Sequence, residues 1–350
     1  SAVCGLAANC WKVKNLQRVR MPRATAPPPV GTFTRALKGE DRCGWRKEVV
    51  FGEELTLAFV ADGHAGHAAA ELCAERALSY VIAECEADAS GAELQKACAV
   101  AFERLHKEAR AASGSAGCTL TVAIVNEKRQ EITIANAGDS AAMLLERDSP
   151  RILTAEHRLS DSPEERERVE SVGGKVAQWA DEKGPRGPLR AWPGGLAVCR
   201  CIGDAPCPSV SAVPSTVVTQ YDPTCGGVLV LASDGVWDAI SPEQVASKVH
   251  KGASPCSAAE KIVKFALRKT GPLDDMTAVV IPLSQGASSP SRPRSANILG
   301  YRLSISASRE SSSESSSDSS SFGRTLPAFF PVLGSVAVGW GGREDDDPES

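Results

Sequence analysis

The sequence predicts an α+β fold in which antiparallel β-sheets are packed with helices on their outer sides. The first observation is that three strand-like runs, 118–126, 131–136 and 140–145, follow one another with only short polar links. The second is that helix-like runs come in separate groups, which disfavours a repeating strand–helix–strand unit. The third is a hydrophobic content of 42% over 350 residues, which is enough to fill a large core.

The helices are predicted from their composition and from start and stop signals. Ser162 can cap a helix that has Pro163 in its first turn and Glu165 three positions later, and two glycines at 173–174 end it. The expected helices cover residues 66–87, 92–112, 162–172, 242–250 and 257–269. The strands are predicted from short apolar or β-branched runs bounded by polar turns. They cover residues 53–61, 118–126, 131–136, 140–145, 196–199, 216–220, 228–232 and 276–281.

Composition divides the chain into three parts. Residues 1–30 form a basic and then proline-rich arm, which is either a solvated terminus or a targeting or docking arm. Residues 31–283 carry all of the predicted helices and strands. Residues 284–350 form a serine-rich, mostly disordered tail, because 311–321 has too little apolar surface to bury, and the tail also holds a short apolar patch at 326–340.

Charge and hydropathy argue against two classes of partner. A net charge of −4 disfavours nucleic acid, because proteins that bind it usually carry a basic excess. No run reaches the roughly 20 apolar residues of a membrane helix, so we expect no membrane partner. We expect a monomer in the cytoplasm or nucleus, and secretion stays open because the sequence upstream of Ser1 is absent.

The 12 cysteines show neither a regular spacing nor a CxxC pair, which favours reduced, structural thiols over a disulfide framework. The tightest group is Cys199, Cys201 and Cys207. A zinc site is an alternative for this group, although a fourth ligand at suitable spacing is missing.

Three apolar runs end on an aspartate, namely Asp62, Asp139 and Asp234, and the pair Asp274–Asp275 precedes the last strand. A buried strand that delivers an unpaired carboxylate at its tip is costly, so several such tips together indicate a cation. Carboxylates without cysteine or histidine partners suit Mg²⁺ or Mn²⁺. Two such ions about 3.5–4 Å apart can lower the pKa of a shared water and stabilise an in-line displacement at phosphorus.

Asp62 is the best candidate to bridge both ions, because Gly63 lets the backbone turn sharply and offer its carbonyl as a ligand. A single Asp-Gly pair is more often a simple turn, so this prediction depends on all of the acids together. His64 is placed to protonate a leaving alkoxide, and its alternative is a core histidine.

Eight motifs in order along the chain resemble those of the metal-dependent serine/threonine protein phosphatases of type 2C. They are 59–65 (FVADGHA), 117–119 (GCT), 135–140 (ANAGDS), 153–157 (LTAEH), 165–174 (ERERVESVGG), 195–204 (GLAVCRCIGD), 231–241 (LASDGVWDAIS) and 274–279 (DDMTAV). Each motif is weak alone, but eight in this order are specific, and the match spans about 31–283.

The resemblance implies a catalytic domain at 31–283, folded as a four-layer α-β-β-α sandwich of two antiparallel sheets flanked by helices. It implies phosphorylated protein substrates and two Mg²⁺ or Mn²⁺ ions, with a weaker third. Asp62 would bridge the two ions and Gly63 would bind through its carbonyl. The remaining metal ligands would be Asp234 and Asp274 at one ion, Glu40 at the other and Asp139 at the third.

The resemblance also implies two residues that act on the substrate. His64 would be the general acid, and Arg35 would hold the substrate phosphate. Three features depart from the family pattern. Arg35 lies farther from Glu40 than the family's arginine does, Asp275 stands where asparagine is common, so that either acid of the pair could be the ligand, and 205–214 is short where the family has a charged flap.

The sequence therefore predicts a metal-dependent protein serine/threonine phosphatase that uses in-line attack by a metal-activated water. The alternative is a pseudophosphatase that binds a partner and does no chemistry, although none of the expected acids is missing. A covalent aspartyl phosphotransferase is disfavoured because position 64 is histidine, and nucleotide hydrolysis is disfavoured because no GxxxxGK[ST] loop is present.

Overall fold

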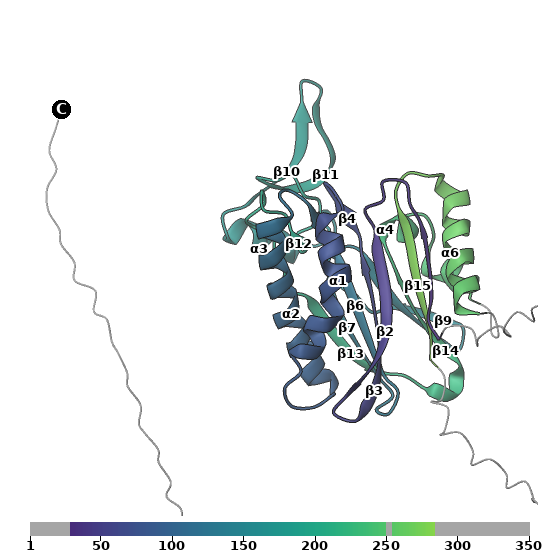
Figure 1. The fold of residues 1–350 in the computed structure, drawn as a ribbon. Coiled ribbons are helices and arrows are strands. Elements are labelled where there is room, and N and C mark those ends of the chain that lie inside the picture. Colours follow the sequence, from purple (N-terminus) through teal and green to yellow (C-terminus); the bar gives the residue numbers. More distant parts are fainter. Residues whose placement is uncertain (1–28, 250–253, 284–350) are drawn as a thin grey trace, which may run out of the picture. The chain divides into compact units, whose positions relative to one another are not determined.

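Two five-stranded antiparallel sheets form the centre of the fold in the computed structural model, which describes residues 29–249 and 254–283 (Figure 1). Their strand orders are β1-β15-β14-β8-β9 and β13-β7-β6-β3-β2. The first sheet contains β1 (Gly31–Arg35), β8 (Ala141–Glu146), β9 (Ser149–Ile152), β14 (Gly227–Ala232) and β15 (Met276–Leu283). The second contains β2 (Arg42–Val50), β3 (Glu53–Ala61), β6 (Leu120–Asn126), β7 (Glu131–Ala137) and β13 (Ser215–Gln220).

Helices cover the outer side of each sheet, which confirms the predicted four-layer sandwich (Figure 1). The second sheet is covered by α1 (Ala68–Ala83) and α2 (Gly91–Ala112). The first sheet is contacted by α4 (Asp234–Trp237), α5 (Pro242–Ala246) and α6 (Pro255–Thr270).

Strand β3 shows how the sequence produces these layers. Its side chains alternate between two hydrophobic clusters, as the two-residue period of a strand requires. Leu57 and Phe59 pack toward α1 and α2, whereas Ala58 and Val60 pack between the two sheets. Both faces of β3 are therefore buried, which explains why it reads as a continuous apolar run rather than an alternating one.

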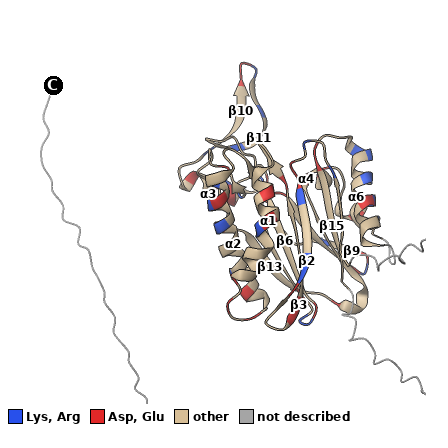
Figure 2. Ribbon diagram, viewed as in Figure 1, with Lys and Arg blue, Asp and Glu red and all other residues tan. Residues whose placement is uncertain are grey.

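The strand directions bring the acid-bearing tips to one end of the sandwich, called the acidic end below. Strands β3 and β7 both pair antiparallel with β6, so Asp62 and Asp139 follow strands that finish at the same edge. In the other sheet, β14 ends where β15 begins, which places Asp234 beside Asp275. Acidic segments lie near α4 at this end (Figure 2).

A β-hairpin projects from the acidic end and was not predicted from the sequence (Figure 1). It is formed by β10 (Lys175–Asp181) and β11 (Gly184–Trp192). Its side chains are mostly exposed and carry no apolar alternation, so the periodic signal of a buried strand is missing. The predicted strand at 196–199 is wrong, because this segment makes only isolated bridges.

Most other predicted elements are confirmed, with shifts at their ends. Helix α3 (Pro163–Ser171) begins after Ser162, whose hydroxyl accepts a hydrogen bond from the Glu165 N–H as predicted. The strand expected at 118–126 is interrupted, since β5 (Gly117–Cys118) joins a small sheet with β4 (Gly63–His64) and β12 (Ile202–Gly203). Strands β1, β2 and β9 were missed. A short 3₁₀ helix covers Pro223–Cys225.

Two further observations concern the described residues only. None of the helices among them is both long and apolar enough to cross a membrane. Ten of the cysteines fall in these parts of the chain, and all ten are free thiols. The predictions for the basic arm and for the serine-rich tail fall on residues outside the described ranges, apart from the last residues of the arm.

Candidate active site

The tips of β3 and β7 are tied together by a threonine. The Asp62 N–H donates to Thr119 Oγ1 at 3.2 Å, and the Thr119 N–H donates to the Asp62 carbonyl at 2.8 Å. Thr119 Oγ1 also lies 2.8 Å from Ser140 Oγ, the residue after Asp139. These contacts hold the two aspartates at fixed positions on neighbouring loops.

The carboxylates of this end repel one another. Burial, followed by the negative charges of Asp41, Asp234 and Asp139, raises the pKa of Asp62 well above its ordinary value. Burial and then the charge of Asp139 raise the pKa of Asp234 to about 6. Desolvation and like charge both disfavour the ionised form, so the group has a strong affinity for added positive charge.

Arg158 supplies positive charge from within the chain. Its guanidinium donates to Asp139 at 2.8 Å, to Asp234 at 3.1 Å and to Asp238 at 2.8 Å. Burial alone would lower the pKa of Arg158, but these carboxylates raise it above its ordinary value. One arginine therefore offsets part of the charge of the cluster, at the side that holds Asp139.

Asp41 is a buried acid that the sequence reasoning did not single out. Its Oδ2 accepts a hydrogen bond from Ser233 Oγ at 2.9 Å, but its Oδ1 is buried and has no hydrogen-bond partner among the residues that the structure describes. Burial raises the pKa of Asp41. A buried carboxylate oxygen without a partner is costly, which again indicates a site made for a cation or for water bound to one.

Glu40 and Gly63 meet at this end. Glu40 Oε1 accepts a hydrogen bond from the Gly66 N–H at 2.7 Å. A Cβ atom at Gly63 would come within 2.6 Å of the Glu40 carbonyl oxygen, so only glycine allows this approach. The predicted ligands Glu40, Asp62 and Gly63 are therefore brought together by the close contact of two loops.

The acidic pair before β15 divides into two roles. The Asp275 carboxylate accepts hydrogen bonds from five backbone N–H groups, those of residues 37 to 41. Asp274 instead lies 2.8 Å from the Lys38 ammonium and is more exposed. The carboxylate of Asp275 is occupied by these five hydrogen bonds. The carboxylate of Asp274 is paired with Lys38 and can also bind a cation.

His64 is held by an acid far away in sequence. Its Nε2 atom lies 2.9 and 2.8 Å from the two carboxylate oxygens of Asp204. Burial alone would lower the pKa of His64, but the Asp204 carboxylate outweighs it, so the pKa is raised. The ring therefore favours the protonated form that a general acid requires, and Nδ1 is the nitrogen left for a substrate.

A glycine makes room for Asp204. A Cβ atom at Gly117 would lie 1.8 Å from the Asp204 carboxylate, so the GCT motif clears the space for this acid. Asp204 itself has a left-handed backbone with φ of 55°, and it follows Gly203. The two motifs thus fit together at the point where β5 pairs with β12.

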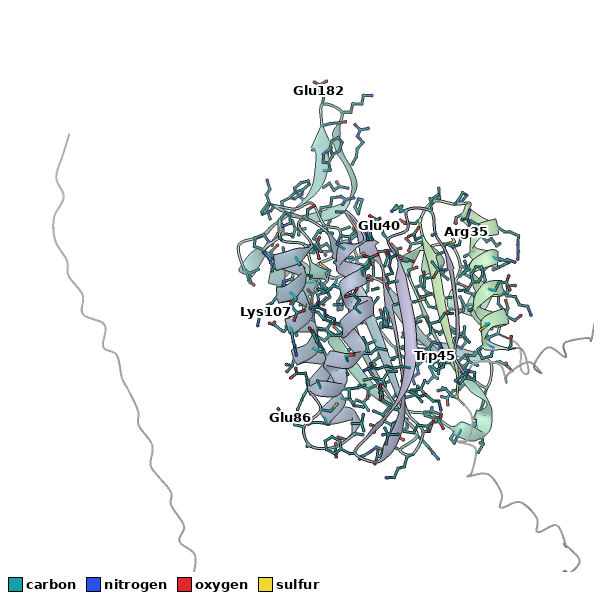
Figure 3. The ribbon with its side chains drawn as sticks, viewed as in Figure 1. Arg35, Glu40, Trp45, Glu86, Lys107 and Glu182 are labelled. Atoms are coloured by element: carbon teal, nitrogen blue, oxygen red, sulfur yellow. The ribbon has the colours of Figure 1, made fainter. Side chains whose placement is uncertain are left out.

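Arg35 lies at the acidic end, but its guanidinium bonds to its own neighbour rather than to the acids. It ends β1, is exposed, and donates to the neighbouring Ala36 carbonyl at 2.9 Å. Figure 3 shows Arg35 and Glu40 at the same end of the sandwich, with Arg35 on the side of α6, and the sheet register pairs Arg35 with Met276, the residue after Asp275. Within the described parts of the chain, no ion pair joins Arg35 to an acid of the cluster.

The donor set fits Mg²⁺ or Mn²⁺. It consists of carboxylates and a backbone carbonyl, which are hard oxygen ligands. The raised pKa values of Asp62 and Asp234 and the unpartnered Oδ1 of Asp41 are what acids without their cation would show. The sequence analysis did not single out three residues that contact the site, Arg158, Asp204 and Asp41, although Arg158 directly follows a quoted motif, Asp204 ends another and Asp41 is adjacent to Glu40.

Comparison with known proteins identifies the same family that the sequence motifs resemble. A family model described as "Protein phosphatase 2C" matches residues 53–271. "Probable protein phosphatase 2C 3" of Oryza sativa subsp. japonica is 38% identical over 250 residues, which cover 69% of this chain and 51% of that protein. "Probable protein phosphatase 2C 12" of Arabidopsis thaliana is 37% identical over 279 residues, which cover 75% of this chain and 64% of that protein. The chain thus spans from about half to just under two thirds of the length of these curated relatives.

Solved structures share the fold. The serine-threonine phosphatase 2C from Toxoplasma gondii superposes with a TM-score of 0.61 at 21% identity, over 73% of this chain and 94% of that chain. A sex determining protein of C. elegans superposes with a TM-score of 0.62 at 22% identity, over 74% of this chain and 65% of that chain. At these identities the likeness concerns the fold alone, and it agrees with the four-layer sandwich.

Proposed function

Because the chain belongs to the protein phosphatase 2C family, we propose that it hydrolyses phosphoserine and phosphothreonine in proteins with the help of Mg²⁺ or Mn²⁺. The single observation that carries this proposal is the convergence of Asp62, Asp139 and Asp234 at one end of the sandwich, where the pKa values of Asp62 and Asp234 are raised and Asp139 pairs with Arg158. Carboxylates that lie this close together repel one another, and a bound cation would offset that repulsion. A hard divalent cation beside a partly exposed histidine suits phosphate ester hydrolysis.

Different residues of the chain would bind the metal ions and donate the proton. Asp62 would bridge two ions, with the Gly63 carbonyl and Glu40 on one side and Asp234 and Asp274 on the other, and Asp139 would hold a weaker third. When bound, the ions supply a water of lowered pKa and positive charge beside the phosphoryl group. His64, oriented by Asp204, would give the proton on Nδ1 to the serine or threonine oxygen as the P–O bond breaks.

The substrate phosphate also needs a positively charged side chain of the protein to hold it. Arg35 remains our candidate for this task, since its exposed guanidinium lies on the segment that leads to Glu40 and, among the described residues, donates only to the adjacent Ala36 carbonyl. Its side chain has the length and freedom to turn toward the acid cluster.

The test is an assay with phosphoserine, phosphothreonine and phosphotyrosine peptides in Mn²⁺, Mg²⁺ or chelator. We expect hydrolysis of the first two only, and none with chelator. Asp62→Asn should lower the rate by about 100-fold or more, because metal ions contribute several kcal/mol to such transition states. Asp238→Asn is the matched control, since it makes the same Asp-to-Asn change at the same end of the sandwich, in a residue that pairs with Arg158 and lies outside the proposed ligand set.

Thermal unfolding of each variant checks that the fold is kept. Hydrolysis that persists in chelator, or in Asp62→Asn at the rate of the control, would contradict the metal assignment. Binding of Mn²⁺ and phosphopeptide by the unaltered chain without turnover would contradict the activity and identify a pseudophosphatase.

A further inference from the structure

A second group of metal-ligating side chains lies beside the acid cluster and differs from it in chemistry. Cys201 Sγ lies 2.6 Å from Asp204 Oδ2, and the same oxygen lies 2.8 Å from His64 Nε2. One ligand atom from each of the three residues falls within 4.8 Å of the other two. An imidazole nitrogen, a thiol sulfur and a carboxylate oxygen therefore converge on one point.

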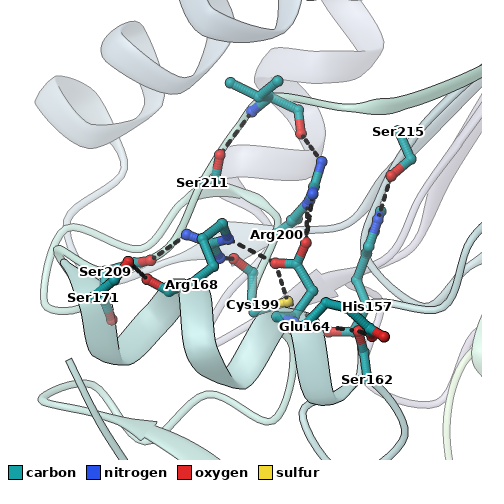
Figure 4. Close-up of polar contacts among 12 residues, drawn as sticks. His157, Ser162, Glu164, Arg168, Ser171, Cys199, Arg200, Ser209, Ser211 and Ser215 are labelled. Carbon is teal, nitrogen blue, oxygen red and sulfur yellow. Dashed lines mark hydrogen bonds and ion pairs between the residues drawn. The ribbon is translucent and has the colours of Figure 1, made fainter.

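The segment that carries Cys201 is held rigidly. Glu165 accepts hydrogen bonds from Arg168 and Arg200 and from the Cys199 thiol, and Figure 4 shows Arg168, Arg200 and Cys199 gathered in this network. Cys199 is therefore committed to Glu165 and is not free to join Cys201. The zinc alternative considered for Cys199, Cys201 and Cys207 is thus replaced by a group built from other partners.

The neighbours of Asp204 fix the other side of the group. Arg110 donates to the carbonyl of Ala205 at 3.0 Å and holds the turn that follows Asp204. Gly117 leaves the space that the Asp204 carboxylate fills. Such support lets three ligands keep their places without a metal, which lowers the cost of binding one.

The ligand types select a different ion from the acid cluster. Thiolate and imidazole ligands favour Zn²⁺, whereas Mg²⁺ and Mn²⁺ prefer oxygen. Three protein ligands and one open position are the usual arrangement of an accessible zinc site. We propose that His64, Cys201 and Asp204 form a Zn²⁺ site that is separate from the Mg²⁺ or Mn²⁺ ligands and that inhibits the enzyme when filled.

The three residues of the group differ in their exposure to solvent. Cys201 is fully buried, and the Asp204 side chain is 4% exposed. The His64 side chain is 28% exposed, so it is the residue of the three that solvent reaches most. An incoming ion would enter there and keep a water as its fourth ligand.

Binding requires small movements and the loss of protons. Zinc–ligand bonds of roughly 2.0–2.3 Å set ligand atoms about 3.3–3.7 Å apart, so hydrogen-bonded neighbours must separate by less than about 1 Å. The ion would replace the thiol proton of Cys201 and the proton shared by His64 and Asp204, and both protons would leave to solvent. No oxidation or bond cleavage is involved.

The inhibitory effect rests on the proposed function of His64, but the binding does not. With zinc on Nε2, the ring would lose its hydrogen bond to Asp204 and the charge that favours proton donation from Nδ1. Mn²⁺ would stay at the carboxylates, because its ligands are different atoms.

The binding test is titration of the chelator-treated full chain with Co²⁺, a coloured substitute for Zn²⁺. Thiolate ligation gives cobalt an intense near-ultraviolet charge-transfer band that carboxylate ligation does not give. We expect this band at one equivalent in the unaltered chain and in Cys207→Ser, and its removal by Zn²⁺. We expect at least a 10-fold loss of the band in Cys201→Ser.

Cys207→Ser is the matched control, since Cys207 is a fully buried thiol of the same region that lies outside the group. Cys201→Ala is a second variant in case a serine hydroxyl destabilises this buried position. Absence of the band in the unaltered chain, or its retention in a folded Cys201 variant, would overturn the site.

The inhibition test measures phosphopeptide hydrolysis in Mn²⁺ as zinc is added, each variant relative to its own rate without zinc. We expect the zinc concentration for half inhibition to rise at least 10-fold in Cys201→Ser and to stay unchanged in Cys207→Ser. Equal inhibition of all three proteins would mean that zinc acts at the acid cluster, and it would overturn the inhibitory role. A chain without phosphatase activity would contradict the proposed function while the cobalt spectrum still decides the site.

Discussion

The backbone N–H of Glu40 donates to the Oδ2 atom of Asp275 at 2.7 Å, although 235 residues separate them. The same carboxylate accepts from the four other N–H groups of residues 37 to 41. Burial would raise the pKa of Asp275, but these N–H donors outweigh it and lower the pKa to about 2. Asp275 therefore builds the loop that presents Glu40, and we propose Asp274 as the metal ligand of the pair.

Asp275→Asn should destabilise the chain. An amide offers one acceptor oxygen, and its NH₂ group would face N–H donors, so buried donors lose their partner. We expect the free energy of unfolding to fall by about 2–3 kcal/mol. Denaturant unfolding without metal measures this, and an unchanged midpoint would contradict the structural role of Asp275.

Asp274→Asn is the matched substitution at the adjacent position, and it should behave in the opposite way. The pair of Asp274 with Lys38 is partly exposed, so we expect the free energy of unfolding to change by no more than about 1 kcal/mol. Calorimetric Mn²⁺ binding should weaken by at least 10-fold. Unaltered Mn²⁺ binding would mean that Asp274 is not a ligand.

Asp234→Asn should stabilise the metal-free chain and remove its stabilisation by metal. The pKa of Asp234 is raised from 3.8 to about 6 by burial and by Asp139, so its charge is unfavourable at neutral pH. Removing the charge should add about 1–3 kcal/mol without metal. Thermal unfolding in chelator tests the gain in stability, and thermal unfolding in Mn²⁺ tests the loss of stabilisation by metal. In chelator, a variant with a lower unfolding midpoint than the unaltered chain would contradict the repulsion between Asp234 and Asp139.

Arg158→Gln should have the opposite effect on the metal-free chain. It leaves Asp139 and Asp234 without their counter-charge, and loss of one partner of a partly buried pair costs about 2–4 kcal/mol. Mn²⁺ should then raise the unfolding midpoint more than in the unaltered chain. Arg151→Gln, which removes an exposed arginine on β9, is the control and should change neither value.

His157 should make stability depend on pH. Its Nδ1 accepts from the Gly138 N–H at 3.1 Å and its Nε2 lies 2.8 Å from Ser215 Oγ, a contact drawn in Figure 4. Burial lowers the pKa of His157 from 6.5 to about 4. The unfolded ring therefore gains a proton first as the pH falls, so the stabilisation is complete above pH 6.5 and is lost toward pH 4.

The size of this effect is up to about 3 kcal/mol. The difference in unfolding free energy between the unaltered chain and His157→Gln should shrink by that amount as the pH falls across this range. A difference that stays constant with pH would show that His157 is not held neutral in the folded chain.

The sequence alone determined the elements whose signal is local. Strand β3 is confirmed at 53–61 because burial on both faces makes it a continuous apolar run. Helix α3 is confirmed because Ser162 and Pro163 mark its start by contacts within one turn. The acids at the strand tips were found for the same reason, since each follows directly on a buried run.

The tertiary structure decided whatever depends on contacts between distant segments. Only the fold shows that His64 is held by Asp204, 140 residues away, and that Arg158 joins Asp139 to Asp238. The β10–β11 hairpin was missed because exposed strands need no apolar period. The different contacts of Asp274 and Asp275 could not be predicted from two adjacent acids, because only the fold shows that Asp275 accepts from the five N–H groups of residues 37 to 41. Local patterns thus locate charged groups along the chain, and the packing of two sheets decides which of them meet.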